Sequence, residues 1–222
     1  MNEQFIEFLA KSGAIKFGEF TLKSGRESPY FISTGVLCDG ANSYELGKHF
    51  AAKIKEIYGA DGIDAIYGPA YKGIPLAVSV SIALQKEFGI NKPWIFDRKE
   101  KKVYGDASAF VGANLDRGAK VVIVDDVFTT GETKVEAKEK IEKSIGAEVV
   151  GIVIAVDRQE RGVRGNAIEE FSSDYGIPVH SITNIKDVFE HLNGRNVDGM
   201  VYVENETFEA YVEYRKKYGI MG

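Results

Sequence analysis

Two apolar segments that lack polar alternation, 121–124 and 148–157, constrain the fold of this chain most strongly. Such segments are typical of interior strands in a parallel sheet, where both faces of the strand are buried. A segment rich in Lys, Glu and Ala, 132–144, lies between them and favours a helix. Parallel strands joined by helices predict an α/β fold with right-handed crossovers.

Strand and helix patterns alternate along most of the chain. In 43–58, Leu46, Phe50, Ile54 and Ile57 share one buried helical stripe. We expect further helices at 2–11, 74–88, 163–175, 185–192 and 206–218, and further strands at 65–68, 93–96, 178–182 and 201–203. Residues 17–34 predict short strands and turns, and 97–118 predict a long loop with two strand-like pieces. We interpret 1–222 as one domain, with a core of about 41–200, a hood from about 1–40 plus C-terminal elements, and a mobile lid at about 98–112.

Composition excludes several classes of function. The net charge of −5 provides no basic field for nucleic acid. No apolar segment approaches the roughly 18–20 residues that cross a bilayer, and the acidic, amphipathic start differs from a secretory signal. Cys38 is the only cysteine, so an intrachain disulfide is impossible, and three scattered histidines predict no zinc site. We therefore expect a cytoplasmic protein without nucleic-acid or membrane partners.

Two adjacent carboxylates, Asp125 and Asp126, end the 121–124 strand, and the loop VFTTGET follows. In open α/β sheets, ligands bind at such strand-to-helix turns. The N-terminus of the following helix offers unpaired N–H groups to a phosphate, whereas the carboxylates suit sugar hydroxyls or a divalent cation. A pair that only caps the helix is the structural alternative. The whole pattern favours a phosphorylated sugar.

A second strand-to-helix turn, GPAYKG at 68–73, is expected on the same sheet edge. Gly68 and Gly73 allow the backbone to approach a ligand closely, and Lys72 adds a positive charge. The alternative is an ordinary turn with a solvated lysine. Two loops suited to anions make a ligand with two phosphate groups plausible.

The segment DRKEKKVYGD, 97–106, lies in a long loop and carries four basic residues close together, with Glu100 among them: Arg98, Lys99, Lys101 and Lys102. A basic lid of this kind would close over a polyanion and exclude water. A solvated surface is the alternative.

Arg158 follows the longest apolar strand and could bind a carboxylate through two parallel hydrogen bonds. A surface salt bridge explains it equally well.

These segments resemble those of the type I phosphoribosyltransferases. The stretches that carry the resemblance are FGEFTLKSGRESPYF (17–31), GPAYKGIP (68–75), FDRKE (96–100), VVIVDDVFTTGET (121–133) and DRQERG (157–162). The resemblance implies a central parallel sheet flanked by helices, with a small hood from the N-terminal segment. It implies transfer of ribose 5-phosphate from 5-phospho-α-D-ribose 1-diphosphate (PRPP) to orotate. The products would be orotidine 5′-monophosphate and pyrophosphate, in the synthesis of pyrimidine nucleotides.

The resemblance also implies roles for individual residues. Catalytic roles fall to Lys102, Asp125, Asp126, Lys72, Arg98 and Tyr104. PRPP would contact Lys23, Tyr71, Lys72, Arg98, Lys99, Lys102, Tyr104, Asp125, Asp126, Val127, Phe128, Thr129, Thr130, Gly131, Glu132 and Thr133. Orotate would contact Lys23, Phe31, Ile32, Thr129 and Arg158. Mg²⁺ would be held mainly through PRPP, with Asp125 or Asp126 reached through water, and the lid would serve the neighbouring subunit of a homodimer.

The sequence departs from the family pattern at three positions and in the lid segment GDASAF (105–110). Ile32 replaces a second aromatic residue, Tyr104 replaces a lid histidine, and Glu132 places a negative charge in the phosphate loop, so its side chain must point outward. A sibling transferase for a purine or uracil is one alternative function. A non-catalytic regulator that senses PRPP and binds nucleic acid is another, but it would need a basic surface or a DNA-binding domain, and the sequence shows neither.

Overall fold

The computed structural model describes residues 2–22, 25–98, 109–128 and 131–220. The elements in chain order are α1 (Glu3–Lys11), β1 (Ile15–Thr21), β2 (Glu27–Ile32), the 3-10 helix η1 (Thr34–Val36), α2 (Gly40–Tyr58), β3 (Ala65–Tyr67), α3 (Gly73–Phe88), β4 (Trp94–Asp97), β5 (Phe110–Gly112), β6 (Lys120–Val127), α4 (Glu132–Ile145), β7 (Glu148–Asp157), α5 (Ala167–Tyr175), β8 (Val179–Asn184), α6 (Ile185–Leu192), β9 (Asn196–Val197), β10 (Met200–Val201) and α7 (Asn205–Tyr218).

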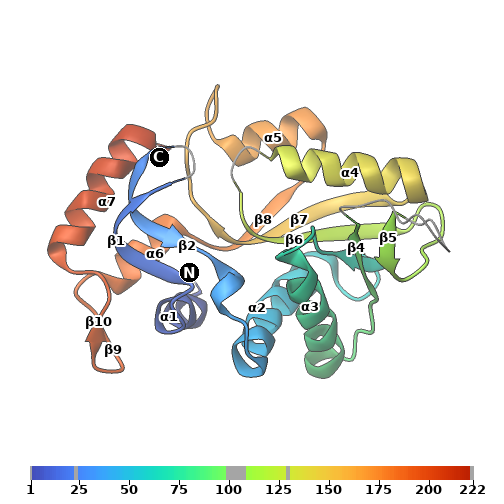
Figure 1. Ribbon diagram of the computed structural model, residues 1–222, viewed down its shortest axis with the longest axis horizontal. Coiled ribbons are helices and arrows are strands. Elements are labelled where there is room, and N and C mark those ends of the chain that lie inside the picture. Colours follow the sequence, from blue (N-terminus) through green and yellow to red (C-terminus); the bar gives the residue numbers. More distant parts are fainter. Residues whose placement is uncertain (1, 23–24, 99–108, 129–130, 221–222) are drawn as a thin grey trace.

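Among the described residues, the central sheet has six strands in the order β5-β4-β3-β6-β7-β8. Neighbouring strands are parallel except β4 and β5, which pair antiparallel at one edge. Helices α4 and α5 cover one face of the sheet, and α2 and α3 cover the other (Figure 1). This confirms the predicted α/β fold with a central sheet flanked by helices. Strand β5 has only three residues, too few for its alternation to be recognised in the sequence.

Strand β6 separates two hydrophobic cores. Val122 and Val124 pack into the core that also holds Phe50 of α2, whereas Val121 and Ile123 pack into the core beneath α4 and α5. Successive side chains of a strand point to opposite faces, so a segment that is apolar at every position is buried on both sides. Each fully buried Val or Ile contributes roughly 1.5–3 kcal/mol from its removal from water. The two carboxylates at the end of β6 therefore sit on a rigid strand.

The N-terminal and C-terminal segments lie side by side at one end of the sheet (Figure 1). The antiparallel hairpin β1–β2 packs beside α7, and aromatic side chains join the elements. Phe189 of α6 stacks on Tyr211 of α7 with ring centroids 4.0 Å apart, and its edge contacts Tyr30 of β2 at 5.8 Å. This hood stands beside the carboxyl ends of the strands. Among the residues placed by the structure, no helix is long and apolar enough to cross a membrane.

Helix α5 begins at Ala167, four residues later than the expected 163–175. The Asn166 side chain accepts hydrogen bonds from the N–H groups of Ile168 and Glu169 and so caps the helix. The Glu170 carboxylate accepts hydrogen bonds from the N–H groups of residues 163–165. These backbone groups are therefore satisfied in a loop, and the expected helix start is wrong.

Candidate functional site

The loop between β6 and α4 gathers the carboxylates and the helix N-terminus that the sequence predicted. Asp125 and Asp126 are partly buried at the carboxyl end of β6, and α4 begins at Glu132, whose side chain is exposed. Gly131 has φ +79°, and a Cβ there would overlap the ring of Phe171. Phe128 is itself buried against Phe171, with ring centroids 5.0 Å apart. A ligand can therefore contact position 128 only through its backbone.

Lys134 is a site residue that the sequence analysis missed. Its side chain turns back from α4 and is buried, with the residue only 4% exposed. Nζ lies 2.5 Å from Oδ2 of Asp125 and donates to the carbonyl oxygen of Val127 at 3.2 Å. The protein thus supplies a counter-ion to one of its two adjacent carboxylates. In the sequence, Lys134 lies within a strongly charged helical segment, and nothing marks it as the buried member.

Asp126 has different surroundings. Its Oδ2 lies 3.9 Å from Nζ of Lys72, which also donates to Oγ of Ser33 at 3.4 Å. Burial and the nearby charge of Asp125 raise the pKa of Asp126, and Lys72 opposes this shift. The two aspartates are therefore not equivalent, because one carries a short ion pair and the other faces an exposed lysine.

The 68–73 loop forms one wall of a cleft of about 300 Å³ next to the β6–α4 loop. Tyr71, which is 70% exposed, Lys72, Asp125 and Thr133 line this cleft. A Cβ on Gly68 would overlap the carbonyl oxygen of Gly73, so the tight turn requires glycine there. The structure therefore brings the two predicted anion loops to one cleft.

Asp97 fixes this loop to the end of β4. Its Oδ1 accepts hydrogen bonds from the Tyr67 hydroxyl at 2.9 Å and the Ala70 N–H at 3.2 Å, and its Oδ2 accepts one from Lys140 at 2.8 Å. Burial raises the pKa of Asp97, but these three hydrogen bonds lower it more, so the net shift is downward. Lys140 also donates to the carbonyl oxygen of Arg98 at 3.1 Å and so holds the point where the predicted lid begins.

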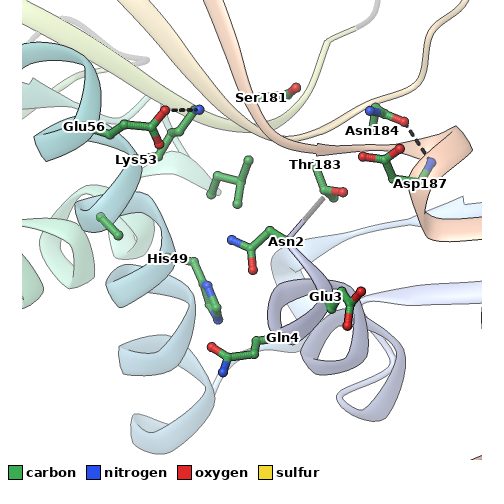
Figure 2. Close-up of a pocket in the computed structure, with 12 residues that line it drawn as sticks. Asn2, Glu3, Gln4, His49, Lys53, Glu56, Ser181, Thr183, Asn184 and Asp187 are labelled. Carbon is green, nitrogen blue, oxygen red and sulfur yellow. Dashed lines mark hydrogen bonds and ion pairs between the residues drawn. The ribbon is translucent and has the colours of Figure 1, made fainter. Parts of the chain in front are cut away.

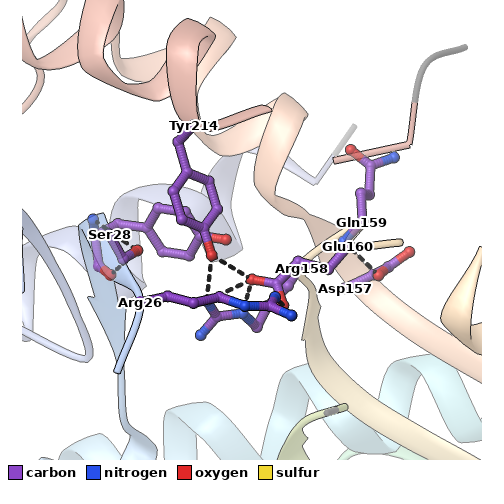
Figure 3. Close-up of polar contacts among 8 residues, drawn as sticks. Arg26, Ser28, Asp157, Arg158, Gln159, Glu160 and Tyr214 are labelled. Carbon is purple, nitrogen blue, oxygen red and sulfur yellow. Dashed lines mark hydrogen bonds and ion pairs between the residues drawn. The ribbon is translucent and has the colours of Figure 1, made fainter. Parts of the chain in front are cut away.

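Arg158 is neither solvent-exposed nor free (Figure 3). Its side chain is 9% exposed, and its Nε and Nη2 donate to Oε1 of Glu160 at 2.9 and 2.6 Å. The Tyr214 hydroxyl donates to the same oxygen at 2.7 Å, and the guanidinium lies 5.0 Å from the ring centroid of Tyr30. The carboxylate that Arg158 binds in this structure is thus the chain's own, in a buried network rather than a surface pair.

The remaining predicted residues divide into three groups. Phe31 is 43% exposed on β2, and its ring lies 5.8 Å from that of Phe20. Ile32 is 6% exposed and packs into the core, so only its backbone could reach a ligand. Six predicted site residues lie outside the described residues: Lys23, Lys99, Lys102, Tyr104, Thr129 and Thr130.

A second cavity, of about 610 Å³, lies between α1, α2 and the β8–α6 junction (Figure 2). The buried Oγ1 of Thr183, which lines it, has no hydrogen-bond partner among the described residues, but other polar groups at its edge are paired within the protein. Lys53 pairs with Glu56 at 3.0 Å, and the Asn184 side chain caps α6 at Asp187. No residue predicted to bind a ligand lines this cavity. Within the ranges that the structure covers, no group of three or more His, Cys, Asp or Glu side chains could hold a metal ion.

Comparisons with known proteins agree with this geometry. A family model described as a phosphoribosyl transferase domain matches residues 34–177. The orotate phosphoribosyltransferase of Bifidobacterium adolescentis is 43% identical over 226 aligned positions, covering 99% of this chain and 98% of the relative. The crystal structure of the Francisella tularensis orotate phosphoribosyltransferase is 38% identical with a TM-score of 0.80, covering 97% and 99% of the two chains. Leishmania donovani UMP synthase is 28% identical with a TM-score of 0.74, and the match covers 97% of this chain and 42% of that one.

Proposed function

The chain belongs to the phosphoribosyltransferase family, and we propose that the cleft beside Asp125 and the cluster around Arg158 are the two halves of one active site. The protein is an orotate phosphoribosyltransferase. It transfers ribose 5-phosphate from PRPP to orotate and releases orotidine 5′-monophosphate and pyrophosphate. The observation that carries this assignment is the 43% identity to an orotate enzyme over 99% of the chain. Its direct test is orotate-dependent release of pyrophosphate from PRPP, with uracil as the comparison base.

We assign the ribose 5-phosphate of PRPP to the β6–α4 loop. Asp125 and Asp126 bind the ribose hydroxyls, and the N–H groups of residues 129–133 bind the 5′-phosphate at the N-terminus of α4. The support is the strand-end position of the carboxylates and the exposure of Glu132, which keeps its charge out of the loop. Val127 and Phe128 contribute backbone groups, and Thr133 lines the cleft.

We assign the pyrophosphate to the cleft wall formed by Tyr71 and Lys72, together with Arg98 at the start of the lid. Lys72 is largely exposed and its Nζ is held only by weak contacts to Ser33 and Asp126, so it is available to an anion. The lid would complete this pyrophosphate site with Lys99, Lys102 and Tyr104.

We assign the base to Arg158 and Phe31, with Lys23, Thr129 and the backbone of Ile32. An orotate carboxylate suits an arginine guanidinium, because both are planar and charged. The exposed face of Phe31 suits a flat pyrimidine ring. Uracil and the purine bases lack a carboxylate and would leave this proposed contact to Arg158 unmade.

Positioning and charge account for the chemistry. As N1 of orotate bonds to C1′, the C1′–O bond to pyrophosphate breaks, and the N1 proton passes to water or to an oxygen of the departing pyrophosphate. At the transition state, positive charge develops at C1′ of the ribose and negative charge on the departing pyrophosphate. Lys72, Arg98 and the lid lysines stabilise that leaving group, while the strand-end carboxylates orient the ribose.

We propose Mg²⁺ as the cofactor, held mainly through PRPP, with a water-mediated contact to Asp126. When bound, it neutralises charge on the pyrophosphate. Asp126 fits this role better than Asp125, because Lys134 already occupies Oδ2 of Asp125 at 2.5 Å. Removal of Mg²⁺ by a chelator should weaken PRPP binding in calorimetry, and the Asp126→Asn variant should respond less to added Mg²⁺ than the wild type.

We propose a cytoplasmic homodimer in which each lid completes the partner's site. The Lys102→Ala variant, which lacks one lysine of the lid, would be mixed with the Asp126→Asn variant, and the two would be allowed to exchange subunits. The mixture should regain about a quarter of wild-type activity, because half of the randomly formed dimers are mixed and each has one intact site. If each lid served its own chain, no intact site could form and the mixture would stay inactive.

A further inference from the structure

The C-terminal helix α7 takes part in the network that holds Arg158. From α7, the Tyr214 hydroxyl donates to Oε1 of Glu160 at 2.7 Å and accepts from Nη2 of Arg158 at 3.3 Å (Figure 3). Oε1 of Glu160 therefore receives hydrogen bonds from two donors of Arg158 and from one tyrosine 54 residues away in the sequence. The arginine and its carboxylate are tied to a distant element rather than only to each other.

Backbone contacts fix α7 against the same loop. The N–H of Arg161 donates to the carbonyl oxygen of Tyr218 at 2.8 Å, and the N–H of Ile220 donates to that of Gln159 at 2.9 Å. Nε of Arg161 donates to the carbonyl oxygen of Gly219 at 2.6 Å. These bonds join both sides of the 158–161 loop to the end of α7 and the residues after it, and so hold Tyr214 beside Glu160.

Within the described residues, this network leaves one edge of the Arg158 guanidinium without a hydrogen-bond acceptor. Nε and Nη2 have acceptors, and Tyr30 covers one face of the guanidinium. Among the residues that the structure describes, Nη1 of Arg158 has no acceptor. A long arginine side chain has many rotamers, and fixing it before the ligand arrives reduces the entropy lost on binding.

We propose that Tyr214 is a positioning residue for base recognition: it holds Glu160, and through it the guanidinium of Arg158, so that Nη1 faces the carboxylate of the base. This inference rests on the proposed role of Arg158. If Tyr214 has this role, α7 contributes to the specificity for a pyrimidine that carries a carboxylate, although Tyr214 need not touch the substrate.

The chain offers a matched control for the test. Tyr211 lies one helical turn from Tyr214, is also buried, and stacks on Phe189, but its hydroxyl has no hydrogen-bond partner among the described residues. Tyr214→Phe should raise the KM for orotate about 3–10-fold, less than the roughly tenfold to hundredfold of a lost charged contact to the substrate, because Tyr214 acts on orotate only through Glu160 and Arg158. The KM for PRPP and kcat should stay within about twofold, and Tyr211→Phe should change none of these constants.

Product binding separates this inference from the proposed function. Orotidine 5′-monophosphate and uridine 5′-monophosphate differ only in the carboxylate, and calorimetry measures both without turnover. Wild-type protein should prefer the first nucleotide, and Tyr214→Phe should lose several-fold of that preference while its affinity for uridine 5′-monophosphate is unchanged. A wild type without the preference would overturn the role of Arg158. A wild type with it, and a folded Tyr214→Phe that keeps it in full, would overturn the role of Tyr214.

Glu160→Ala, which removes the acceptor of the Tyr214 hydroxyl, provides a second variant for the same idea. If Tyr214 acts through Glu160, the double variant Glu160→Ala, Tyr214→Phe should be no worse for orotate than Glu160→Ala alone. Additive losses would show that Tyr214 acts independently of Glu160 and would contradict the proposal. Thermal denaturation of each variant checks that the fold is retained.

Discussion

Nζ of Lys134 lies 2.5 Å from Oδ2 of Asp125, so the protein neutralises one of the two adjacent carboxylates at the end of β6. Its neighbour Asp126 faces Lys72 at 3.9 Å. The pair therefore divides into a structurally bound aspartate and one more available to the ribose and metal. Because the two aspartates have different partners, we expect substitutions at the two positions to have different effects on stability.

Lys134→Met should destabilise the protein, because it leaves the Asp125 carboxylate partly buried without its cation. Breaking a buried pair costs about 3–5 kcal/mol of the free energy of unfolding. Because Asp125 is partly exposed, we expect a loss of about 3 kcal/mol here. The melting temperature should then fall by roughly 6–12 °C. Lys138→Met is the matched control, since Lys138 forms an ordinary helical pair with Glu142 at 2.8 Å. Equal decreases in melting temperature in the two variants would show that the pair of Lys134 with Asp125 stabilises the fold no more than an ordinary helical pair does.

Asp126→Asn should stabilise the ligand-free protein at pH 7 while abolishing most activity. Burial and the charge of Asp125 raise the pKa of Asp126 in the folded state above the unfolded value of about 3.9. Between the unfolded and the folded pKa of Asp126, the folded state binds more protons than the unfolded state. The free energy of unfolding therefore falls as the pH rises through this range, and the destabilisation by the charged Asp126 is fully present at pH 7. The gain in melting temperature should vanish below about pH 4.

Asp125→Asn is the contrasting variant. Two adjacent carboxylates would ordinarily be expected to repel each other, so that replacing either one would stabilise the ligand-free state. The structure corrects this expectation, because asparagine at 125 leaves Lys134 buried without an anion. Asp125→Asn should lower the melting temperature at pH 7. A rise equal to that of Asp126→Asn would contradict the ion pair.

Arg158→Ala should raise the KM for orotate far more than the KM for PRPP. Loss of a charged hydrogen bond costs about 1.5–3 kcal/mol, or roughly tenfold to a hundredfold in affinity. Steady-state kinetics with each substrate varied in turn measures the difference. Parallel increases in both constants would indicate that Arg158 only maintains the fold through Glu160 and Tyr214.

Tyr104→Phe should reduce kcat by about tenfold or less, because a tyrosine hydroxyl can supply only a neutral hydrogen bond to pyrophosphate. With an unperturbed pKa of about 10, tyrosine is a poor proton donor near neutrality. Lys102→Ala should lose considerably more, since it removes charge next to the developing anion. A larger loss in Tyr104→Phe would make the tyrosine the general acid of the lid.

The sequence predicts the fold well where burial alone determines the pattern. The strand at 148–157 has the predicted bounds, because burial on both faces leaves an uninterrupted apolar segment. Strand β5 and the start of α5 could not be placed so well. The first has only three residues, and the second depends on Glu170 accepting backbone hydrogen bonds from a loop.

For the site, the sequence predicts which loops meet but not how their charges are satisfied. The β6–α4 and 68–73 loops line one cleft because both follow parallel strands of the same sheet. Lys134 could not be recognised, since its burial depends on how its side chain turns back toward Asp125. Nor could the link from Arg158 to Tyr214, because contacts between residues 56 positions apart follow from the packing of α7.

The central claim is orotate phosphoribosyl transfer, and a base panel tests it most directly. The protein with Mg²⁺ and PRPP would be given orotate, uracil, adenine or hypoxanthine in turn, and pyrophosphate release would be followed. Asp126→Asn under the same conditions controls for contaminating activity. We predict rapid release with orotate and little with the other bases. Release that is equal or faster with uracil or a purine, or none with any base, would contradict the account.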